Sequence, residues 1–209
     1  MGKIQRFLEF PLLYKKYMIW KILVNPIVRG SFGALGKGSF IGKPLYISGK
    51  KYIFIGSDVG IDAGARIEAI LKYHKDNGDI EFRPRLEIGN RVSIGQNIHM
   101  TCAKSVIIED DVVISSNVLI TDNNHSYKKI DTHPLQQELE ILPVKIGRYS
   151  FIGAGARVLP GVQIGRNVIV GANAVVTKDI PDYTIAVGIP ARVIKRYDEE
   201  NRMWVRTET

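Results

Sequence analysis

The chain lacks several features that mark particular classes of protein. It has a single cysteine, Cys102, among 209 residues, which excludes an internal disulfide framework and fits a reducing compartment. No apolar run reaches the roughly 18 residues that a membrane-spanning helix needs. The apolar residues 1–28 also lack the small-residue cleavage pattern of a signal peptide. We therefore expect a cytoplasmic protein, with contact at the inner membrane surface left open.

The chain also lacks the charge pattern of a nucleic-acid-binding protein. Its formal charge is +8, from 29 Lys and Arg against 21 Asp and Glu. Yet it contains no long block of basic residues, and basic and aromatic residues do not interleave in its repeat region. The excess positive charge favours a phosphate-bearing small molecule or an anionic membrane as partner, and we expect no nucleic acid.

What the chain does contain is an internal repeat of six residues over positions 146–181. Read in sixes, this stretch is IGRYSF, IGAGAR, VLPGVQ, IGRNVI, VGANAV and VTKDIP. A branched aliphatic residue opens every hexad: Ile146, Ile152, Val158, Ile164, Val170 and Val176. The fifth place holds Ser150, Ala156, Val162, Val168, Ala174 and Ile180. Neither a regular strand nor a helix has this period. A triangular coil does, because each of its three sides is one short strand and a corner of six residues. The repeat predicts an all-β solenoid, a parallel β-helix with a continuous core.

The same phase runs less regularly through the preceding residues. It begins at Leu35 and, after a skip, reaches Ile55, so that one coil takes 20 residues from 35 to 55. The spacing from Ile88 to Ile108 is the same. Residues near 69–85 break the phase and are expected to form a loop insertion or a bulged coil. Residues near 122–145 break it again, and because a coil cannot absorb this length, we expect them to leave the solenoid as an extended loop. A long insertion of this kind on a rigid scaffold is where function usually lies.

These patterns divide the chain into three parts. We expect an N-terminal helical or capping segment over 1–34, the β-helix over 35–181, and an extended segment with a short helix over 182–209. Residues 4–28 are rich in apolar and aromatic residues that lysines interrupt. They could cap the open end of the solenoid, or lie as a basic amphipathic helix on a membrane surface. The sequence leaves both open.

Among the four histidines, His125 is the candidate for chemistry. It follows directly on the repeat phase, in the polar cluster TDNNHSY at the root of the second insertion. A rigid wall would hold one side of this residue while its ring faces outward, which suits a general base. We expect His74 to be solvated and His133 to be structural or at the surface. His99 lies within the repeat phase, as a wall residue or as part of a site.

TDNNHSY, the loop after it, PVKIGRYSFIGAGARVLPGVQIG, VVTKDIP and GIPARVIK together resemble the hexapeptide-repeat acyltransferases. Within that family the pattern is most similar to the maltose/galactoside acetyltransferases and the capsule or lipopolysaccharide O-acetyltransferases. The likeness covers residues 35–196 and is nearly continuous from 143 onward. It implies a left-handed β-helix and a homotrimer with the CoA groove between subunits. It also implies acetyl transfer from acetyl-CoA to a sugar hydroxyl of a surface-polysaccharide precursor, with His125 as the base and with no metal and no acyl-enzyme.

The resemblance further implies which residues bind the donor and the acceptor. Donor contacts are implied for Asn124, Phe151, Ala154, Ala172, Thr177, Lys178, Arg192 and Lys195, and acceptor contacts for Asn97, Asp122 and Asn123. By this resemblance the ring of Phe151 would line the CoA groove, and the corners at Ala154 and Ala172 would face the pantetheine arm. The basic residues would reach the adenine end and the phosphates. The chain departs from the polysaccharide-type pattern Asp-His-x-His, because asparagine replaces the first histidine.

Two readings of other classes stand beside this one. The γ-class carbonic anhydrases share the solenoid, but they hold a zinc-type ion through three histidines, two of them close in sequence. Here His125 and His133 are eight residues apart, and His99 has no partner at the required spacing. The other reading is a non-catalytic scaffold, which predicts no CoA affinity. An amine acceptor instead of a hydroxyl stays within the acetyltransferase class.

Overall fold

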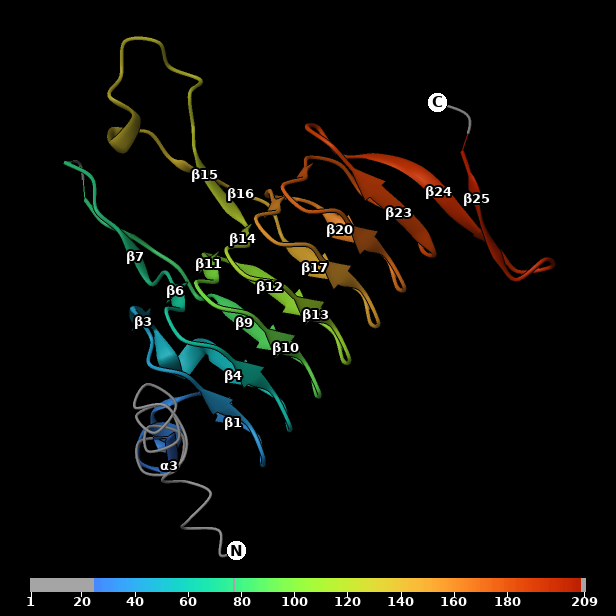
Figure 1. The fold of residues 1–209 in the computed structure, drawn as a ribbon. Helices are drawn as coiled ribbons and strands as arrows, with labels where there is room; N and C mark the ends of the chain where they lie inside the picture. The colour runs from blue at the N-terminus through green and yellow to red at the C-terminus, as the bar shows by residue number, and fades with distance from the viewer. Residues whose placement is uncertain (1–24, 77, 208–209) are drawn as a thin grey trace, which may run out of the picture.

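The computed structural model describes residues 25–76 and 78–207. The chain visits three sheets in turn, and each coil adds one parallel strand to each sheet (Figure 1). Sheet A contains β1 (Ala34–Leu35), β4 (Ile53–Ile55), β9 (Arg85–Ile88), β12 (Ser105–Ile108), β17 (Val144–Ile146) and β20 (Gln163–Ile164). Sheet B begins with β2 (Phe40–Ile41), β5 (Gly60–Ile61), β10 (Ser93–Ile94), β13 (Val113–Ile114), β18 (Phe151–Ile152) and β21 (Ile169–Val170). Sheet C contains β3 (Tyr46–Ser48), β6 (Arg66–Ala69), β11 (His99–Cys102), β14 (Leu119–Thr121), β19 (Arg157–Val158) and β22 (Val175–Val176).

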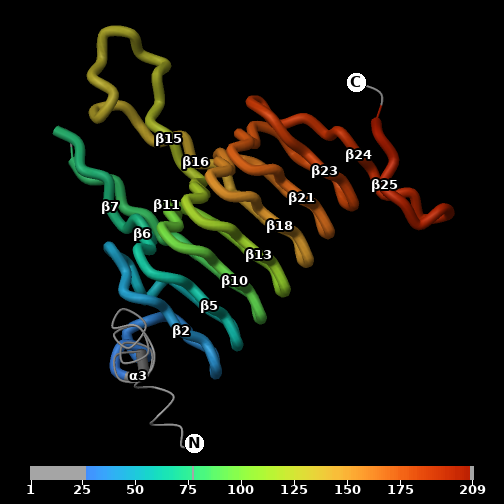
Figure 2. The backbone as a smooth tube through the Cα atoms, in the orientation of Figure 1, coloured from blue at the N-terminus to red at the C-terminus, as the bar shows by residue number. Residues whose placement is uncertain are grey.

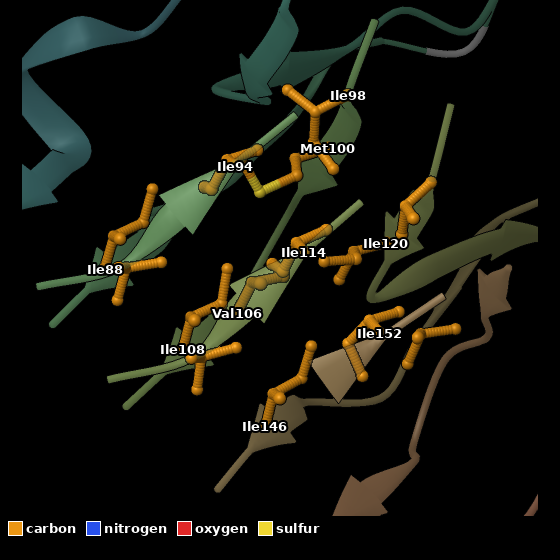
Figure 3. Packing of buried hydrophobic residues seen from close by; sticks show 14 of the residues in the cluster. Ile88, Ile94, Ile98, Met100, Val106, Ile108, Ile114, Ile120, Ile146 and Ile152 are labelled. Carbon is orange, nitrogen blue, oxygen red and sulfur yellow. The ribbon is translucent and has the colours of Figure 1, made fainter. Parts of the chain in front are cut away.

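The aliphatic residues that open the hexads stack on one another inside the coils. In sheet B, Ile114 pairs with Ile94 of the coil before and with Ile152 of the coil after, and all three are almost fully buried. Figure 3 shows such side chains in successive coils pointing into one common interior. Fifth-place residues are interior as well, and Ala156 and Ala174 have no exposed surface. The predicted β-solenoid is confirmed.

The register also confirms the two coils of 20 residues. Leu35 pairs with Ile55 in sheet A, and Ile88 pairs with Ile108. Parallel strands in adjacent coils keep every aliphatic in register with its neighbours, so the core runs without interruption through the stack.

The glycine after the opening aliphatic is required by the close approach of successive coils. A Cβ on Gly153 would lie 2.6 Å from the Ala172 nitrogen, and one on Gly147 would lie 2.6 Å from the Gly165 carbonyl carbon. Neither glycine has a positive φ; the left-handed corner positions fall later, for example at Asn173. Glycine is therefore required at this position by steric contact, and not by a left-handed backbone conformation.

Two antiparallel hairpins leave the solenoid at the corner between sheets C and A. The first pairs β7 (Lys72–Tyr73) with β8 (Ile80–Glu81), and the second pairs β15 (Asn123–His125) with β16 (Leu139–Ile141). Because β6 and β14 both pair with β11, the two hairpins start on the same edge of the stack. They project from it in the same direction (Figures 1 and 2).

The prediction of a short C-terminal helix within 182–209 is wrong. The chain there forms β23 (Thr184–Val187), β24 (Arg192–Asp198) and β25 (Met203–Arg206), which extend sheet B, with β24 and β25 antiparallel. Two causes favour strands: β-branched and aromatic residues suit a pleated surface, and the last coil offers an open edge that must be covered. Tyr197 and Trp204 pack edge to face across the final pair, with ring centroids 5.4 Å apart.

At the N-terminal end, the described chain contains only short helical turns. These are α3 (Asn25–Val28) and the 3-10 turns η2 (Arg29–Ser31) and η3 (Lys50–Tyr52). The N-terminal helical segment expected over 1–34 is therefore not supported by residues 25–34. Its remainder, and nearly all of the 4–28 segment, lie outside the described residues. Within the part that is described, no helix combines the length and apolar character needed to cross a bilayer.

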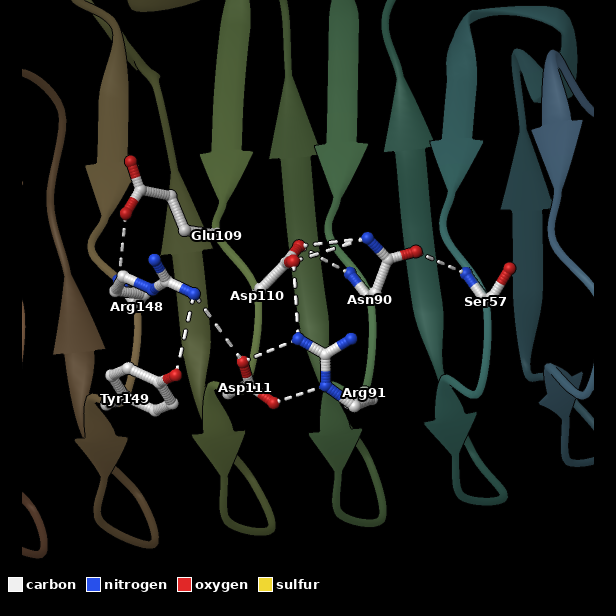
Figure 4. A network of polar contacts seen from close by, with 8 residues as sticks. All are labelled: Ser57, Asn90, Arg91, Glu109, Asp110, Asp111, Arg148 and Tyr149. Carbon is white, nitrogen blue, oxygen red and sulfur yellow. Dashed lines mark hydrogen bonds and ion pairs between the residues drawn. The ribbon is translucent and has the colours of Figure 1, made fainter.

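A polar ladder connects neighbouring coils at the corner between sheets A and B (Figure 4). The Ser57 backbone N–H donates to Asn90 Oδ1 at 2.9 Å, and the Asn90 side chain in turn donates to Asp110. Arg91 donates to both carboxylate oxygens of Asp111 at 2.6 and 2.7 Å. Each contact joins one coil to the next, so the ladder holds the stack in register on the side away from the hairpins.

Candidate active site

The root of the second hairpin is anchored by a buried carboxylate. Asp122 has no exposed surface. Its two oxygens accept from the backbone N–H groups of Ala103, Lys104 and Ser105 at 2.7–2.8 Å. A carboxylate that accepts several N–H bonds needs no cation partner to be stable in the interior. Asp122 therefore faces inward, whereas the resemblance implied that it faces the acceptor.

Cys102 lies in the same buried corner. Burial raises the pKa of its thiol to about 12, and the charge of Asp122 adds to the shift. The thiol has no exposed surface and stays protonated near neutral pH. It behaves as a core residue, because only a thiolate would be a strong nucleophile.

A hydroxyl network fixes the direction in which the second hairpin leaves the wall. Thr101 Oγ1 donates to Thr121 Oγ1 at 2.7 Å, and Thr121 Oγ1 donates to the Asn123 carbonyl at 2.9 Å. The Asn123 amide group donates to Thr101 Oγ1 at 3.3 Å and to Asp122 Oδ1 at 2.9 Å. Thr101 and Thr121 are partners in the sheet C register, so the rigid solenoid aims β15 and the histidine at its end.

His125 lies in that strand, paired with Leu139 of β16, and its side chain is exposed. Its Nδ1 lies 3.2 Å from the hydroxyl of Tyr73, which comes from β7 of the other hairpin. The Tyr73 hydroxyl also donates to the Leu135 carbonyl at 2.7 Å. The two rings are tilted against each other with centroids 5.7 Å apart. Nε2, on the other side of the imidazole, has no hydrogen bond within the described chain, so it can accept a proton from a bound molecule.

Tyr73 is not among the residues that the sequence pattern identified, because residues 69–85 carry no recognisable motif beyond the break in the repeat. A signal was nevertheless present in the phase. Ile67 and Ile120 both lie one coil from Met100 in the same column of sheet C. Insertions that follow these two residues must leave by the same corner. Their side chains can therefore meet, although 52 residues separate Tyr73 from His125.

The residues implied for the donor are divided between two corners and sheet B. Thr177 and Lys178 are exposed at the corner of sheets C and A, the corner of His125, two coils further along. Ala154 and Ala172 are exposed at the corner of sheets B and C, one coil apart. Phe151 lies just before that corner on sheet B, with 41% of its surface exposed.

The remaining implied residues lie on strands and at corners. Arg192 and Lys195 belong to β24 at the C-terminal end of sheet B, and Asn124 is exposed beside His125. Asn97 lies at the corner of sheets B and C, where its amide donates to Asn117 Oδ1 at 3.3 Å. One copy of the chain thus does not bring all the implied donor residues to the histidine.

His99, the histidine inside the repeat phase, lies on the outer face of sheet C. Its Nε2 is buried without a hydrogen-bond partner in the described chain, and lies 3.8 Å from the Glu68 carboxylate. It lines a shallow depression together with Asn97, Asn117 and Arg157. The described residues include no group of three or more His, Cys, Asp or Glu that could hold a metal ion.

Family models match both regular stretches of the solenoid. Residues 143–178 match "Bacterial transferase hexapeptide (six repeats)", and residues 85–122 match "Hexapeptide repeat of succinyl-transferase". A relative in Escherichia coli K12, "Putative lipopolysaccharide biosynthesis O-acetyl transferase WbbJ", is 35% identical over 168 residues, which cover 77% of this chain and 80% of that protein. The chain belongs to the hexapeptide-repeat acyltransferases.

Other relatives agree with an acetyltransferase of this family. A galactoside O-acetyltransferase of Escherichia coli K12 is 32% identical over 61% of this chain and 64% of its own length. The solved maltose O-acetyltransferase of Clostridium difficile 630 is 27% identical, with a TM-score of 0.51 over 93% of this chain and 82% of that one. AntD, an N-acyltransferase of Bacillus cereus solved with dTDP and 3-hydroxybutyryl-CoA, is 21% identical with a TM-score of 0.68 over 84% of this chain and 89% of its own. At that identity the likeness concerns the fold alone.

Proposed function

We propose that this acetyltransferase transfers acetyl from acetyl-CoA to a hydroxyl group of a sugar, in a precursor of a surface polysaccharide. The observation that carries the proposal is the placement of His125. It is exposed at the end of an anchored strand, with Nδ1 hydrogen-bonded and Nε2 without a partner in the described chain. The sugar and the polysaccharide pathway come from the names of the relatives, an O-acetyl transferase of lipopolysaccharide biosynthesis and a galactoside O-acetyltransferase.

The chemistry follows from that placement. Nε2 of His125 takes the proton of the acceptor hydroxyl as its oxygen attacks the thioester carbonyl carbon, forming a C–O bond. The tetrahedral oxyanion is held by N–H and other polar donors. The C–S bond then breaks, and the CoA sulfur receives the proton from Nε2. The products are the acetyl ester and free CoA, and His125 returns to its neutral form.

The exposed corners suit the donor in two respects. The backbone N–H groups of Ala154 and Ala172 have no acceptor within the described chain, so they are available to carbonyl oxygens of the pantetheine arm. Lys178, Arg192 and Lys195 form no ion pair among the described residues, and such cations can bind the phosphates. Phe151 would line the groove with its exposed ring.

Because these residues lie at different corners, we propose that the complete site forms between copies of the chain in a homotrimer. His125 of one copy would face the alanine corner and Phe151 of the next. On the acceptor side we propose Asn97 and Asn123, which lie at the two edges of the outer face of sheet C. The left-handed winding of the coils is part of the same proposal.

The test is acetyl-CoA turnover, followed as release of free thiol, by wild type and His125→Ala. The acceptors are maltose, galactosides, nucleotide sugars and an amino sugar. We expect at least one hydroxyl acceptor to stimulate release, and His125→Ala to lower kcat by about 10²–10⁴-fold. Binding of CoA, measured by calorimetry, should be unchanged in the variant because His125 contacts the acceptor.

Each other outcome would contradict a stated part of the proposal. Full turnover by His125→Ala would exclude this residue as the base. Stimulation by the amino sugar alone would change the acceptor from a hydroxyl to an amine. Absence of CoA binding by the wild type would exclude the enzyme and favour the scaffold.

A further inference from the structure

The hydrogen bonds around Tyr73 determine which nitrogen of His125 carries the proton. A phenol has one O–H to donate. The Leu135 carbonyl can only accept, and it lies 2.7 Å from the Tyr73 oxygen, so the phenol proton points toward it. At the 3.2 Å contact with His125 Nδ1 the Tyr73 oxygen must then be the acceptor. Nδ1 therefore carries the N–H in the neutral ring, and Nε2 carries the lone pair.

The Leu135 carbonyl is itself held in a built turn. Leu135 is in the 3-10 turn η4 (Pro134–Gln136), and its N–H donates to His133 Nδ1 at 3.3 Å. The buried side chain of Gln137 closes the loop, because it bonds the N–H and the carbonyl of Lys129 and the carbonyl of Thr132 at 2.9–3.0 Å. The acceptor of the Tyr73 proton is thus fixed by its own loop.

The strand that carries Tyr73 is held against this loop at a second point. The Asp76 N–H donates to Gln136 Oε1 at 2.9 Å, so the first hairpin contacts both Leu135 and its neighbour. Tyr73 is half-buried, and its ring lies against the imidazole. The hydroxyl can neither turn away freely nor exchange its acceptor for water without breaking these contacts.

We propose that Tyr73 is a positioning residue that selects the Nδ1–H tautomer of His125 and so leaves Nε2 unprotonated to act as the base. This inference rests on the proposed function of His125. When Nε2 takes the acceptor proton, both ring nitrogens carry hydrogen, and Nδ1–H continues to donate to Tyr73. The hydrogen bond from the Tyr73 hydroxyl to the Leu135 carbonyl and the one from His125 Nδ1–H to the Tyr73 oxygen therefore persist through the reaction. Only the proton on Nε2 moves. The first insertion takes part in the site through this residue.

The first test observes the tautomer directly and needs no acceptor. In protein labelled with ¹⁵N-histidine, the His125 signals are assigned by their loss in His125→Ala, at a pH where the ring is neutral. We expect a pyrrole-type Nδ1 and a pyridine-type Nε2 in the wild type. In Tyr73→Phe, which keeps the ring but removes the hydroxyl, the tautomer should become mixed or reversed. An Nε2–H tautomer in the wild type, or no change in Tyr73→Phe, would overturn the inference.

The second test uses the acetyl-CoA turnover assay with the best acceptor of the panel. Tyr73→Phe should lower kcat by about 10–100-fold, a part of the 10²–10⁴-fold that a positioned base contributes, with KM for acetyl-CoA within about twofold. The matched control is Tyr127→Phe, at an exposed tyrosine in the loop of the second hairpin, which should behave as the wild type. If His125→Ala is inactive while Tyr73→Phe keeps full kcat, only the inference fails. If His125→Ala is active, the proposed function fails.

Discussion

Asp122 shows how one buried residue can direct an exposed histidine three residues later. Its carboxylate binds three consecutive backbone N–H groups of the β11–β12 corner and the side chain of Asn123. Its carbonyl accepts from the N–H of Leu142 at 2.8 Å, where β16 returns to the solenoid. The same residue therefore holds both ends of the hairpin that carries His125.

Replacing Asp122 should damage both stability and activity. In Asp122→Ala the three N–H groups lose their acceptor, and we expect the free energy of unfolding to fall by more than about 2 kcal/mol. Because β15 loses its anchor, kcat should fall further than the loss of folded protein explains. The measurements are urea unfolding and acetyl-CoA turnover. Asp131→Asn, at an exposed position of the same loop, is the control. Unchanged unfolding in Asp122→Ala would contradict the anchoring role.

Among the elements, the polar ladder between sheets A and B contributes pH-dependent stability. Hydrogen bonds from Asn90 lower the pKa of Asp110, and the bidentate bonds from Arg91 lower the pKa of Asp111. The side-chain hydrogen bond with Lys145 is the main cause that lowers the pKa of Glu109. A carboxyl group whose pKa is depressed on folding stabilises the native state above its unfolded pKa. That stability is lost as pH falls through the folded value.

The melting temperature should therefore decrease when the pH is lowered past roughly 4, where the carboxyl groups of the unfolded chain titrate. Between about pH 5 and 7 this network should leave the melting temperature unchanged. In Arg91→Gln the pKa of Asp111 returns toward its ordinary value, so the acid-induced fall should be smaller than in the wild type. Arg83→Gln, which removes an exposed arginine without an ion pair in the described chain, is the control. Scanning calorimetry from pH 3 to 7 compares the three proteins. Equal acid slopes in Arg91→Gln and wild type would refute the assignment.

For the molecule as a whole, the outer faces of the three sheets differ. In the C-terminal coils the outer face of sheet A carries Lys145 and Gln163, whereas sheet B presents a row of apolar side chains in neighbouring coils. In this row Val113, Phe151 and Ile169 are paired in register and are 36–41% exposed. Burial of such a row stabilises association. It lies beside the alanine corner, where the proposed groove between copies would form.

We expect the wild-type protein to sediment as a trimer. A charge in the apolar row, in Val113→Asp or Ile169→Asp, should shift the equilibrium toward monomer, because a carboxylate is costly to bury in an apolar contact. Gln163→Asp, on the outer face of sheet A, should leave the trimer intact. A monomeric wild type would contradict the proposed trimer. If Val113→Asp and Ile169→Asp remain trimeric, the contact between copies must lie on another face.

The sequence by itself determined the solenoid, its register and the column in which each aliphatic residue lies. A period of six and two skips of two residues contain that information, since each coil repeats the backbone of the one before. The same period located the two insertions and identified His125 at the root of one of them. The resemblance supplied the chemistry expected at that histidine. Local pattern was sufficient for these features because contacts in a solenoid join neighbouring coils.

Only the tertiary structure decided the features that depend on contacts without a period. The prediction of a C-terminal helix was wrong because this segment pairs, through β24, with the open edge of sheet B. No local sequence pattern encodes that edge. Asp122 faces inward because the β11–β12 corner presents three N–H groups to it, and sequence spacing does not show the direction of a side chain. Tyr73 reaches His125 because two hairpins, far apart in the chain, leave the stack by one corner and fold against each other. Such contacts depend on which distant segments the stacked coils bring side by side, and therefore on the structure of the whole solenoid.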